Sequence, residues 1–199
     1  YKKTLNAFAK TLADLQLNYL DLYLIHWPAS SSRHPDWDML NLETWRAMTD
    51  LYESGKIRAI GVSNFLPHHI ENLMQNAKVT PAVDQLEYHP GYTQQAAVDY
   101  CRKNQILVEA WSPIGRRRVF EEPLILELSE KYHVSPAQIC LRFALQNGVI
   151  PIPPAIQYSC DLASGNTKVT VHQQAVDSLL QRTMTIQFRI IIYIQAVLI

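Results

Sequence analysis

Side chains that could take part in chemistry recur at the ends of short apolar segments of this sequence. The segment LDLYLIHW at residues 20–27 is the clearest, because it ends in an imidazole, which can hold or release a proton near neutral pH. Three later segments end in a similar way. The polar or aromatic residues at the four ends are His26 and Trp27, Ser63 and Asn64, Gln85 and Glu87, and Trp111 and Ser112. If these ends meet in the fold, they bring hydroxyl, amide, imidazole and indole groups into one site.

Strand and helix patterns alternate along the first 153 residues. Near the start, apolar residues recur at the spacing of a helix, and five later apolar segments have the pattern of strands. The helices are expected at 5–15, 41–56, 66–78, 93–104, 121–132 and 136–147, and the strands at 20–27, 57–65, 81–90, 106–115 and 148–153. Short connections between alternating strands and helices indicate parallel strands joined by right-handed crossovers. The carboxyl ends of these strands, with their polar residues, should therefore lie at one edge of a sheet.

Two fold classes use that edge for chemistry. A (β/α)₈ barrel carries its active site at the carboxyl ends of its strands, and a doubly wound sheet binds ligands there at its switch point. No GxGxxG sequence follows any predicted strand, which counts against a dinucleotide-binding Rossmann sheet. The sequence therefore predicts an α/β fold of the TIM (β/α)₈ barrel type, incomplete, with residues 1–153 as its domain.

Composition and charge exclude several function classes. The formal net charge is zero, so nothing suggests a nucleic-acid partner or an anionic membrane partner. Cys101, Cys140 and Cys160 lack CxxC spacing, which argues against a disulfide framework or a zinc site and suits a reducing cytoplasm. No signal peptide pattern opens the sequence, and the apolar run at 190–199 is too short to span a bilayer. We expect a cytoplasmic protein, and the oligomeric state stays open.

Five segments in this order and spacing resemble the aldo-keto reductases: LDLYLIHWP, LYESGKIRAIGVSNF, VDQLEYHP, EAWSPIG and GVIPIP. The resemblance covers roughly Tyr1 to Pro153, and it is greatest to the small bacterial type that reduces diketo-sugar acids and assorted aldehydes. It implies a TIM barrel of which this chain holds about strands four to eight. It also implies NADPH as cofactor and reversible hydride transfer to a small carbonyl substrate.

The resemblance assigns roles to the residues at the strand ends. It makes His26 the catalytic histidine, which points a hydrogen-bond donor at the carbonyl oxygen where negative charge grows. Ser63, Asn64 and Gln85 match the set that binds the nicotinamide carboxamide, and these side chains supply both donors and acceptors. Trp111 matches the aromatic residue that stacks on the nicotinamide ring, where tyrosine is commoner.

The following loop and the substrate mouth are assigned in the same way. Ser112, Ile114 and Gly115 match the loop that wraps the pyrophosphate, and Trp27 is expected to line the mouth of the substrate site. The arginines of the run 116–118 could add cofactor contacts, although a solvated loop is the interpretation that we favour.

Each assignment has a structural alternative. His26 could be a buried histidine bonded to a backbone carbonyl, and Trp111 could be a core residue. Ser63 and Asn64 could simply cap the helix that follows them. A metal site at His26 and His89 would need further ligands, which the sequence does not offer in a recognisable pattern.

The sequence departs from the family pattern at both ends. The family's aspartate, general-acid tyrosine and lysine belong to βα units that the resemblance places before Tyr1. After GVIPIP, the residues Pro154 to Gln157 stand where the resemblance implies a lysine and a serine, then an arginine and an asparagine, for the 2′-phosphate and the adenine. Residues 154–199 form a divergent tail of unknown structure.

These departures shape the hypotheses on function. The first hypothesis is an NADPH-dependent aldo-keto reductase that is inactive as this partial chain. We expect no bound metal. The alternatives are a non-catalytic nicotinamide-nucleotide-binding barrel and a non-functional fragment. Two open sheet edges would also make the chain fold poorly, unless the tail or another chain covers an edge.

Overall fold

The structure is a computed structural model that describes residues 1–152 and 191–194 of the 199-residue chain. The described residues form one parallel sheet of six strands in the order β5-β4-β3-β2-β1-β6. The strands are β1 Leu20–Ile25, β2 Ile57–Ser63, β3 Val83–Glu87, β4 Leu107–Trp111, β5 Ile150–Pro151 and β6 Ile191–Ile194. The parallel α/β arrangement predicted from the sequence is confirmed.

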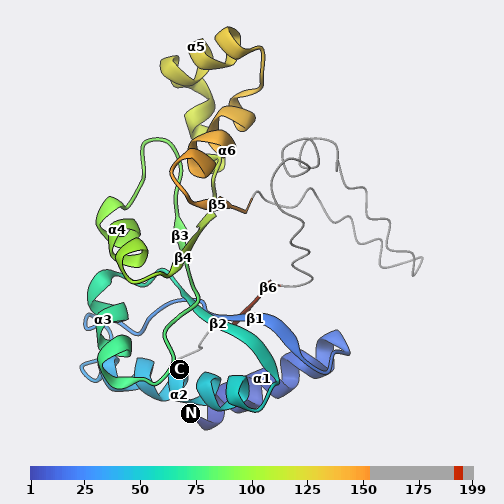
Figure 1. Ribbon diagram of the computed structural model, residues 1–199, viewed down its shortest axis with the longest axis vertical. Helices are drawn as coiled ribbons and strands as arrows, with labels where there is room; N and C mark the ends of the chain where they lie inside the picture. Colours follow the sequence, from blue (N-terminus) through green and yellow to red (C-terminus); the bar gives the residue numbers. More distant parts are fainter. Residues whose placement is uncertain (153–190, 195–199) are drawn as a thin grey trace.

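Helices connect the first five strands. They are α1 Lys2–Leu15, α2 Trp37–Glu53, α3 Pro67–Asn76, α4 Gln95–Lys103, the 3₁₀ helix η1 Gly115–Glu121, α5 Pro123–Tyr132 and α6 Pro136–Gln146. Figure 1 shows α1 to α4 around the sheet in one part of the molecule, while α5 and α6 project from it at the far end. None of the helices in the described part of the chain is long and apolar enough to cross a bilayer.

The core lies mainly between the strands and the helices α1 to α4. Tyr23 and Ile25 of β1 are buried there, and Phe8 of α1 meets the Tyr23 ring edge-on at 5.3 Å between centroids. A second, smaller cluster joins Leu22 and Leu24 of β1 to Val83 of β3. Consecutive β1 residues thus fall in two separate clusters, as expected for a strand whose two faces are both covered.

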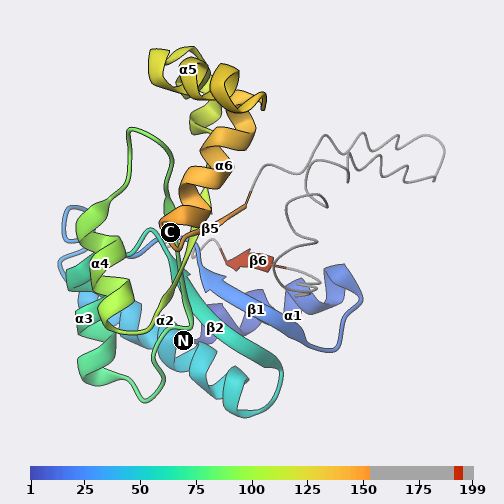
Figure 2. The same cartoon turned by 45° about the horizontal axis from the view of Figure 1, so that its top comes forward.

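The sixth strand was not predicted. Residues 191–194, within the apolar run at 190–199, form β6, which pairs with β1 in parallel from Leu22 with Ile191 to Ile25 with Ile194. Figure 2 shows β6 alongside β1. β6 thus lies along the edge of β1 that the sequence prediction left open. Cys160 and Pro154 to Gln157 lie outside the described residues.

Element boundaries differ from the sequence prediction in two instructive places. β1 ends at Ile25, so His26 and Trp27 lie just beyond the strand rather than inside it. The run that contains Arg116 to Arg118, expected to be a loop, forms η1 because backbone N–H groups donate to carbonyls three residues back, as Arg117 does to Ile114 at 2.9 Å. The three arginines remain exposed, as the solvated interpretation requires.

Candidate active site

The predicted residues gather at the carboxyl edge of the sheet. Ser63 ends β2, Gln85 lies in β3 and Trp111 ends β4. Parallel register pairs Ser63 with Gln85 and Gln85 with Glu109, so neighbouring strands present these groups at the same height. His26 follows β1 directly. The residues His26, Ser63, Asn64, Gln85 and Trp111 thus lie side by side at the carboxyl ends of β1 to β4, and we call them the row.

Asn64 connects this row. Its side-chain Nδ2 donates to the backbone oxygen of His26 at 3.0 Å and to Ser63 Oγ at 3.1 Å, and its Oδ1 accepts from Trp111 Nε1 at 2.8 Å. Its backbone N–H donates to the oxygen of Gln85 at 2.9 Å. Asn64 has φ +61°, a left-handed conformation that asparagine tolerates better than most residues. One residue therefore joins groups from four neighbouring strand ends.

The alternative role of Ser63 and Asn64 as a helix cap is not supported. The N-cap of α3 is Leu66, and its backbone N–H donates to Nδ1 of His69 at 3.0 Å. Ser63 Oγ donates instead to the backbone oxygen of Gln85 at 2.8 Å. Ser63 and Asn64 instead form hydrogen bonds to residues on neighbouring strands, and these bonds fix them at the edge of the sheet.

A buried carboxyl lies behind the row. Gln85 Nε2 donates to Glu109 Oε2 at 2.9 Å, and both side chains are buried. Burial raises the pKa of Glu109, and the hydrogen bond from Gln85 opposes that rise. Sequence analysis missed Glu109, although a lone acidic residue inside the apolar strand LVEAW was a usable signal. The contact orients the Gln85 amide.

The histidine and the tryptophan after β1 differ in exposure. His26 is half-buried, whereas Trp27 is 54% exposed. Their rings meet edge-on with centroids 6.3 Å apart. An exposed indole beside an imidazole suits the expected place of Trp27 at the mouth of a site, because it offers flat apolar surface to a small ligand.

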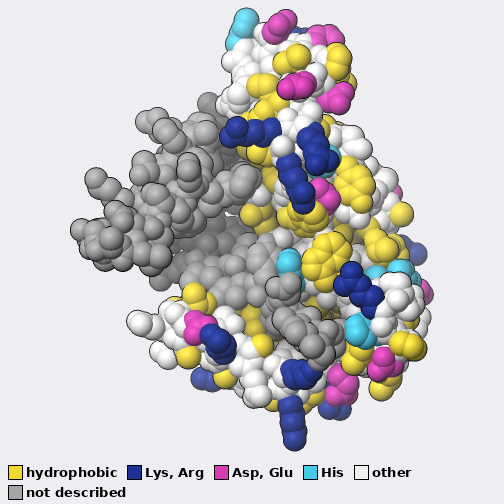
Figure 3. Space-filling model, turned by 180° about the vertical axis from the view of Figure 1, so that it is seen from behind, with side chains coloured by type: hydrophobic (Ala, Val, Ile, Leu, Met, Phe, Trp, Pro, Cys, Tyr) yellow, Lys and Arg dark blue, Asp and Glu magenta, His cyan; other side chains and the backbone are white. Residues whose placement is uncertain are grey.

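The loop after β4 turns tightly. Ser112, Gly115, Arg116 and Arg117 all have φ between +52° and +68°. A Cβ on Gly115 would come within 2.9 Å of Val119 Cγ1 and 3.2 Å of His89 Nδ1, so only glycine fits there. Ile114 next to it is half-buried. In Figure 3, Lys and Arg side chains gather beside the projecting end of the molecule. The three arginines of η1 are exposed.

The His89 ring contacts neighbouring groups of the protein. Its Nδ1 lies 2.8 Å from the oxygen of Pro90, and its Nε2 lies 3.9 Å from a Glu87 carboxylate oxygen. No group of three or more His, Cys, Asp or Glu side chains that could hold a metal occurs within residues 1–152.

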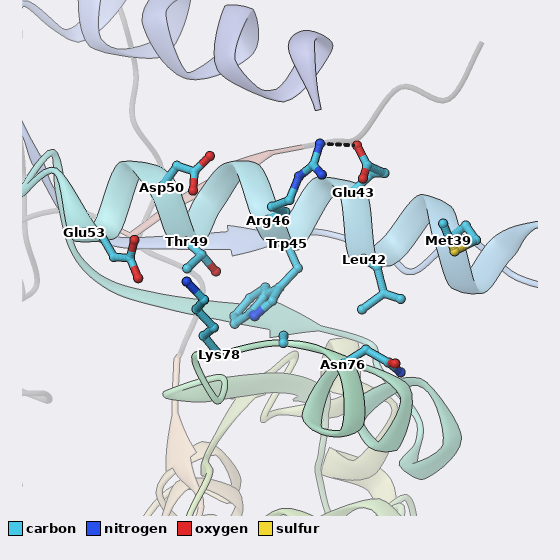
Figure 4. Close-up of a pocket in the computed structure, with 11 residues that line it drawn as sticks. Met39, Leu42, Glu43, Trp45, Arg46, Thr49, Asp50, Glu53, Asn76 and Lys78 are labelled. Carbon is cyan, nitrogen blue, oxygen red and sulfur yellow. Dashed lines mark hydrogen bonds and ion pairs between the residues drawn. The ribbon is translucent and has the colours of Figure 1, made fainter.

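Two cavities lie away from the strand-end row. One, of about 390 Å³, is shown in Figure 4 between α2 and the residues that follow α3. It holds the ion pair of Arg46 with Glu43 at 3.0 Å, and Lys78 places it near the amino end of β3. The other, of about 820 Å³, is lined mainly by apolar side chains of α5 and α6. Neither is lined by a residue of the row.

Comparison with known proteins identifies relatives of this chain. A model of the aldo/keto reductase family matches residues 1–122. Glyoxal reductase of Bacillus subtilis is 46% identical over 157 residues, which are 79% of this chain and 54% of that protein. The chain thus spans about half the length of the curated relatives that it matches.

Solved structures that are similar to this chain also include aldo-keto reductases. An aldo/keto reductase from Brucella melitensis is 41% identical with a TM-score of 0.72, and the match covers 79% of this chain and 58% of that one. An aldo-keto reductase of Bombyx mori in complex with NADP is 35% identical with a TM-score of 0.66, over 76% of this chain and 53% of that one.

Proposed function

The chain belongs to the aldo/keto reductase family, and we propose that it forms the nicotinamide-binding and substrate-orienting part of an NADPH-dependent reductase of small aldehydes or ketones. The network that joins the His26 backbone, Asn64 and Trp111 at the carboxyl edge of the sheet carries this proposal. A relative named for glyoxal reduction and a similar structure with NADP support the substrate and cofactor classes.

The residues of the row fit a nicotinamide nucleotide. Trp111 offers a half-buried flat ring, and Ser63, Asn64 and Gln85 form a set of hydroxyl and amide groups beside it. Ser112, Ile114 and Gly115 form the tight turn next to that ring, the part proposed to hold the pyrophosphate.

The chemistry assigned to this chain is orientation and charge stabilisation. When bound, the reduced nicotinamide supplies a hydride to the carbonyl carbon. His26 donates a hydrogen bond from its imidazole to the carbonyl oxygen, which becomes more negative as the carbon is reduced. Trp27 packs against the substrate at the mouth of the site. The oxygen then needs a proton, and the resemblance places its donor on βα units before Tyr1.

We therefore expect nucleotide binding without turnover from these 199 residues. In this proposal β1 to β5 correspond to strands four to eight of a (β/α)₈ barrel formed by residues 1–153, and residues 154–199 are a divergent tail. The buried, free thiols of Cys101 and Cys140 suit the reducing cytoplasm in which we place the protein.

A fluorescence titration tests the proposal. NADPH added to the full chain should quench tryptophan emission, and Trp111→Ala should remove most of that quenching and weaken binding. Trp37→Phe is the matched control, because Trp37 packs on His68 and His69 at 5.6 and 5.3 Å between ring centroids, outside the row. A folded sample that shows no quenching would contradict the proposal.

A further inference from the structure

Asn41 of α2 is a buried asparagine whose side chain binds the backbone of Ala29. Its Oδ1 accepts from the Ala29 N–H at 2.8 Å, and its Nδ2 donates to the Ala29 oxygen at 3.2 Å. Asn41 is 3% and Ala29 4% exposed. Asparagine is a weak helix former and is rarely buried, so packing alone does not account for it at this position of α2. Its amide instead satisfies both polar backbone groups of a residue that lies outside the helices and strands of the described chain.

The segment 26–29, which follows β1, is held at both of its ends by asparagine side chains. Asn64 Nδ2 donates to the backbone oxygen of His26 at 3.0 Å, and Asn41 forms its two hydrogen bonds at the other end. Between these ends lie only Trp27 and Pro28, and the proline ring restricts one backbone torsion further. The backbone that carries Trp27 is therefore fixed on either side of the indole.

The side chain of Trp27 is open to a ligand, although its backbone is fixed. The indole is 54% exposed, and its ring meets the imidazole of His26 edge-on at 6.3 Å between centroids. An aromatic ring on a fixed backbone loses less conformational entropy when a ligand packs on it than a ring on a free loop does. The hydrogen bonds of Asn41 thus bear on binding, although Asn41 itself is buried.

We propose that Asn41 is a positioning residue for Trp27, because its amide holds the Ala29 backbone and thereby sets where the indole lies at the mouth of the substrate site. The proposal rests on the proposed function and adds to it a residue of α2 that acts through the segment 26–29. The substrate class that this ring favours is a small carbonyl compound with an apolar group, since the indole offers a flat apolar surface.

Amide hydrogen exchange and contacts between rings test the proposal without any ligand. In the unmodified chain the N–H of Ala29 should exchange more slowly than that of Ser32, which lies in the exposed part of the same loop. A nuclear Overhauser contact should join the rings of Trp27 and His26. The N–H of the fully buried Trp45 indole reports whether each variant is folded.

Two substitutions of Asn41 separate its hydrogen bonds. Asn41→Ala removes both of them, so exchange at Ala29 should become about tenfold faster and the contact between the Trp27 and His26 rings should weaken. Asn41→Asp keeps an oxygen that accepts from the Ala29 N–H. This amide should therefore stay protected, which tests the bond even if Asn41→Ala does not fold.

Asn72→Ala is the matched control. Asn72 of α3 donates from its Nδ2 to the backbone oxygen of Asp38 in α2 at 3.2 Å, so the control also removes an asparagine contact with the backbone near the start of α2. It should change neither reading, and an equal change would overturn the proposal. Fast exchange at Ala29 in the unmodified chain, or ring contacts that persist in a folded Asn41→Ala chain, would also overturn it.

A double-mutant cycle then tests the effect on binding, with acetophenone as the probe and oxidised NADP in place of the reduced cofactor, so that no hydride is supplied. Asn41→Ala should lower the affinity for acetophenone about fivefold and leave the affinity for NADP nearly unchanged. In the Trp27→Ala background the same substitution should cost almost nothing further.

The possible failures of this binding experiment are distinguishable. An equal loss of acetophenone affinity in both backgrounds, or an equal loss for acetophenone and NADP, would mean that Asn41 does not act through Trp27 and would overturn the proposal. If the unmodified chain binds no acetophenone, the substrate-orienting part of the proposed function is contradicted instead. Exchange at Ala29 and the ring contacts then still decide whether Asn41 positions Trp27.

Discussion

The carboxyl edge of β1 to β4 and the hairpin formed by α5 and α6 hold their side chains in different ways. At the edge, Ser63 and Gln85 are each 1% exposed and are fixed by hydrogen bonds across strands. On the α5–α6 hairpin, Leu124 is 62% and Tyr132 58% exposed. Polar groups are thus buried at the edge, while large apolar groups are exposed on the hairpin.

The contrast follows from what lies behind each region. The strands that form the edge pack against α1 to α4 in the main hydrophobic core. The hairpin adjoins β5, which pairs with β4 through only two residues, Ile150 and Pro151. α6 is anchored where Phe143 stacks on Tyr88 at 5.7 Å between ring centroids, and the buried residue of α5 is Ile125. A site that needs fixed geometry is therefore built on the better-packed region.

The largest expected effect compares core with hairpin directly. Trp45→Ala should lower the free energy of unfolding by about 3–5 kcal/mol, because the side chain is fully buried in the core. Leu124→Ala should change it by no more than about 0.5 kcal/mol. Urea denaturation of both variants gives the two values. Similar losses would show that the hairpin contributes as much packing as the sheet, and the contrast would be wrong.

The second prediction concerns a buried acid near the row. Asp84 of β3 is fully buried, its Oδ1 has no hydrogen-bond partner among the described residues, and its Oδ2 lies 3.7 Å from Cys101 Sγ. Burial raises the pKa of Asp84 from 3.8 to about 8, and the backbone N–H of Phe65 partly opposes this. Between these two values the folded chain holds a proton that the unfolded chain releases, so stability falls as pH rises.

Asp84→Asn should remove that dependence. Between about pH 5 and pH 7, the unmodified chain should lose about 3 kcal/mol of stability relative to the variant. Denaturation midpoints across this pH range measure the difference, and Asp36→Asn, at an exposed position, serves as control. Parallel pH profiles for the unmodified chain and Asp84→Asn would show that the carboxyl is charged in the folded state.

Local sequence patterns predicted the six α-helices and five of the strands because periodicity depends on neighbouring residues. They also predicted which side chains meet at the edge, since parallel strands place their carboxyl ends together. The pairing of β6 with β1 was missed because it joins segments from opposite ends of the chain. The contacts of Glu109 with Gln85 and of Asn64 with Trp111 were missed because they depend on register and side-chain direction across strands.

The smallest expected effect comes from adding one methyl group to a glycine in each of the two regions. A Cβ on Gly61 of β2 would lie 2.6 Å from Leu24 Cδ2 and 2.7 Å from the backbone oxygen of Val83, and the backbone cannot move aside cheaply. Gly61→Ala should therefore cost about 1–3 kcal/mol and push β2 away from β3. Gly148→Ala, near the hairpin, meets nothing closer than 4.0 Å and costs only the strain of its φ of +65°.

The two glycine variants differ in what they do to the site as well as to stability. Because β2 and β3 carry Ser63 and Gln85, a shift between them alters the surroundings of Trp111, and its fluorescence emission should change in Gly61→Ala. Gly148→Ala should leave that emission as it is, even if its free energy of unfolding falls by about 1 kcal/mol. A changed emission in Gly148→Ala would mean that the hairpin region and the row are mechanically linked, so that the better-packed region does not hold the site by itself.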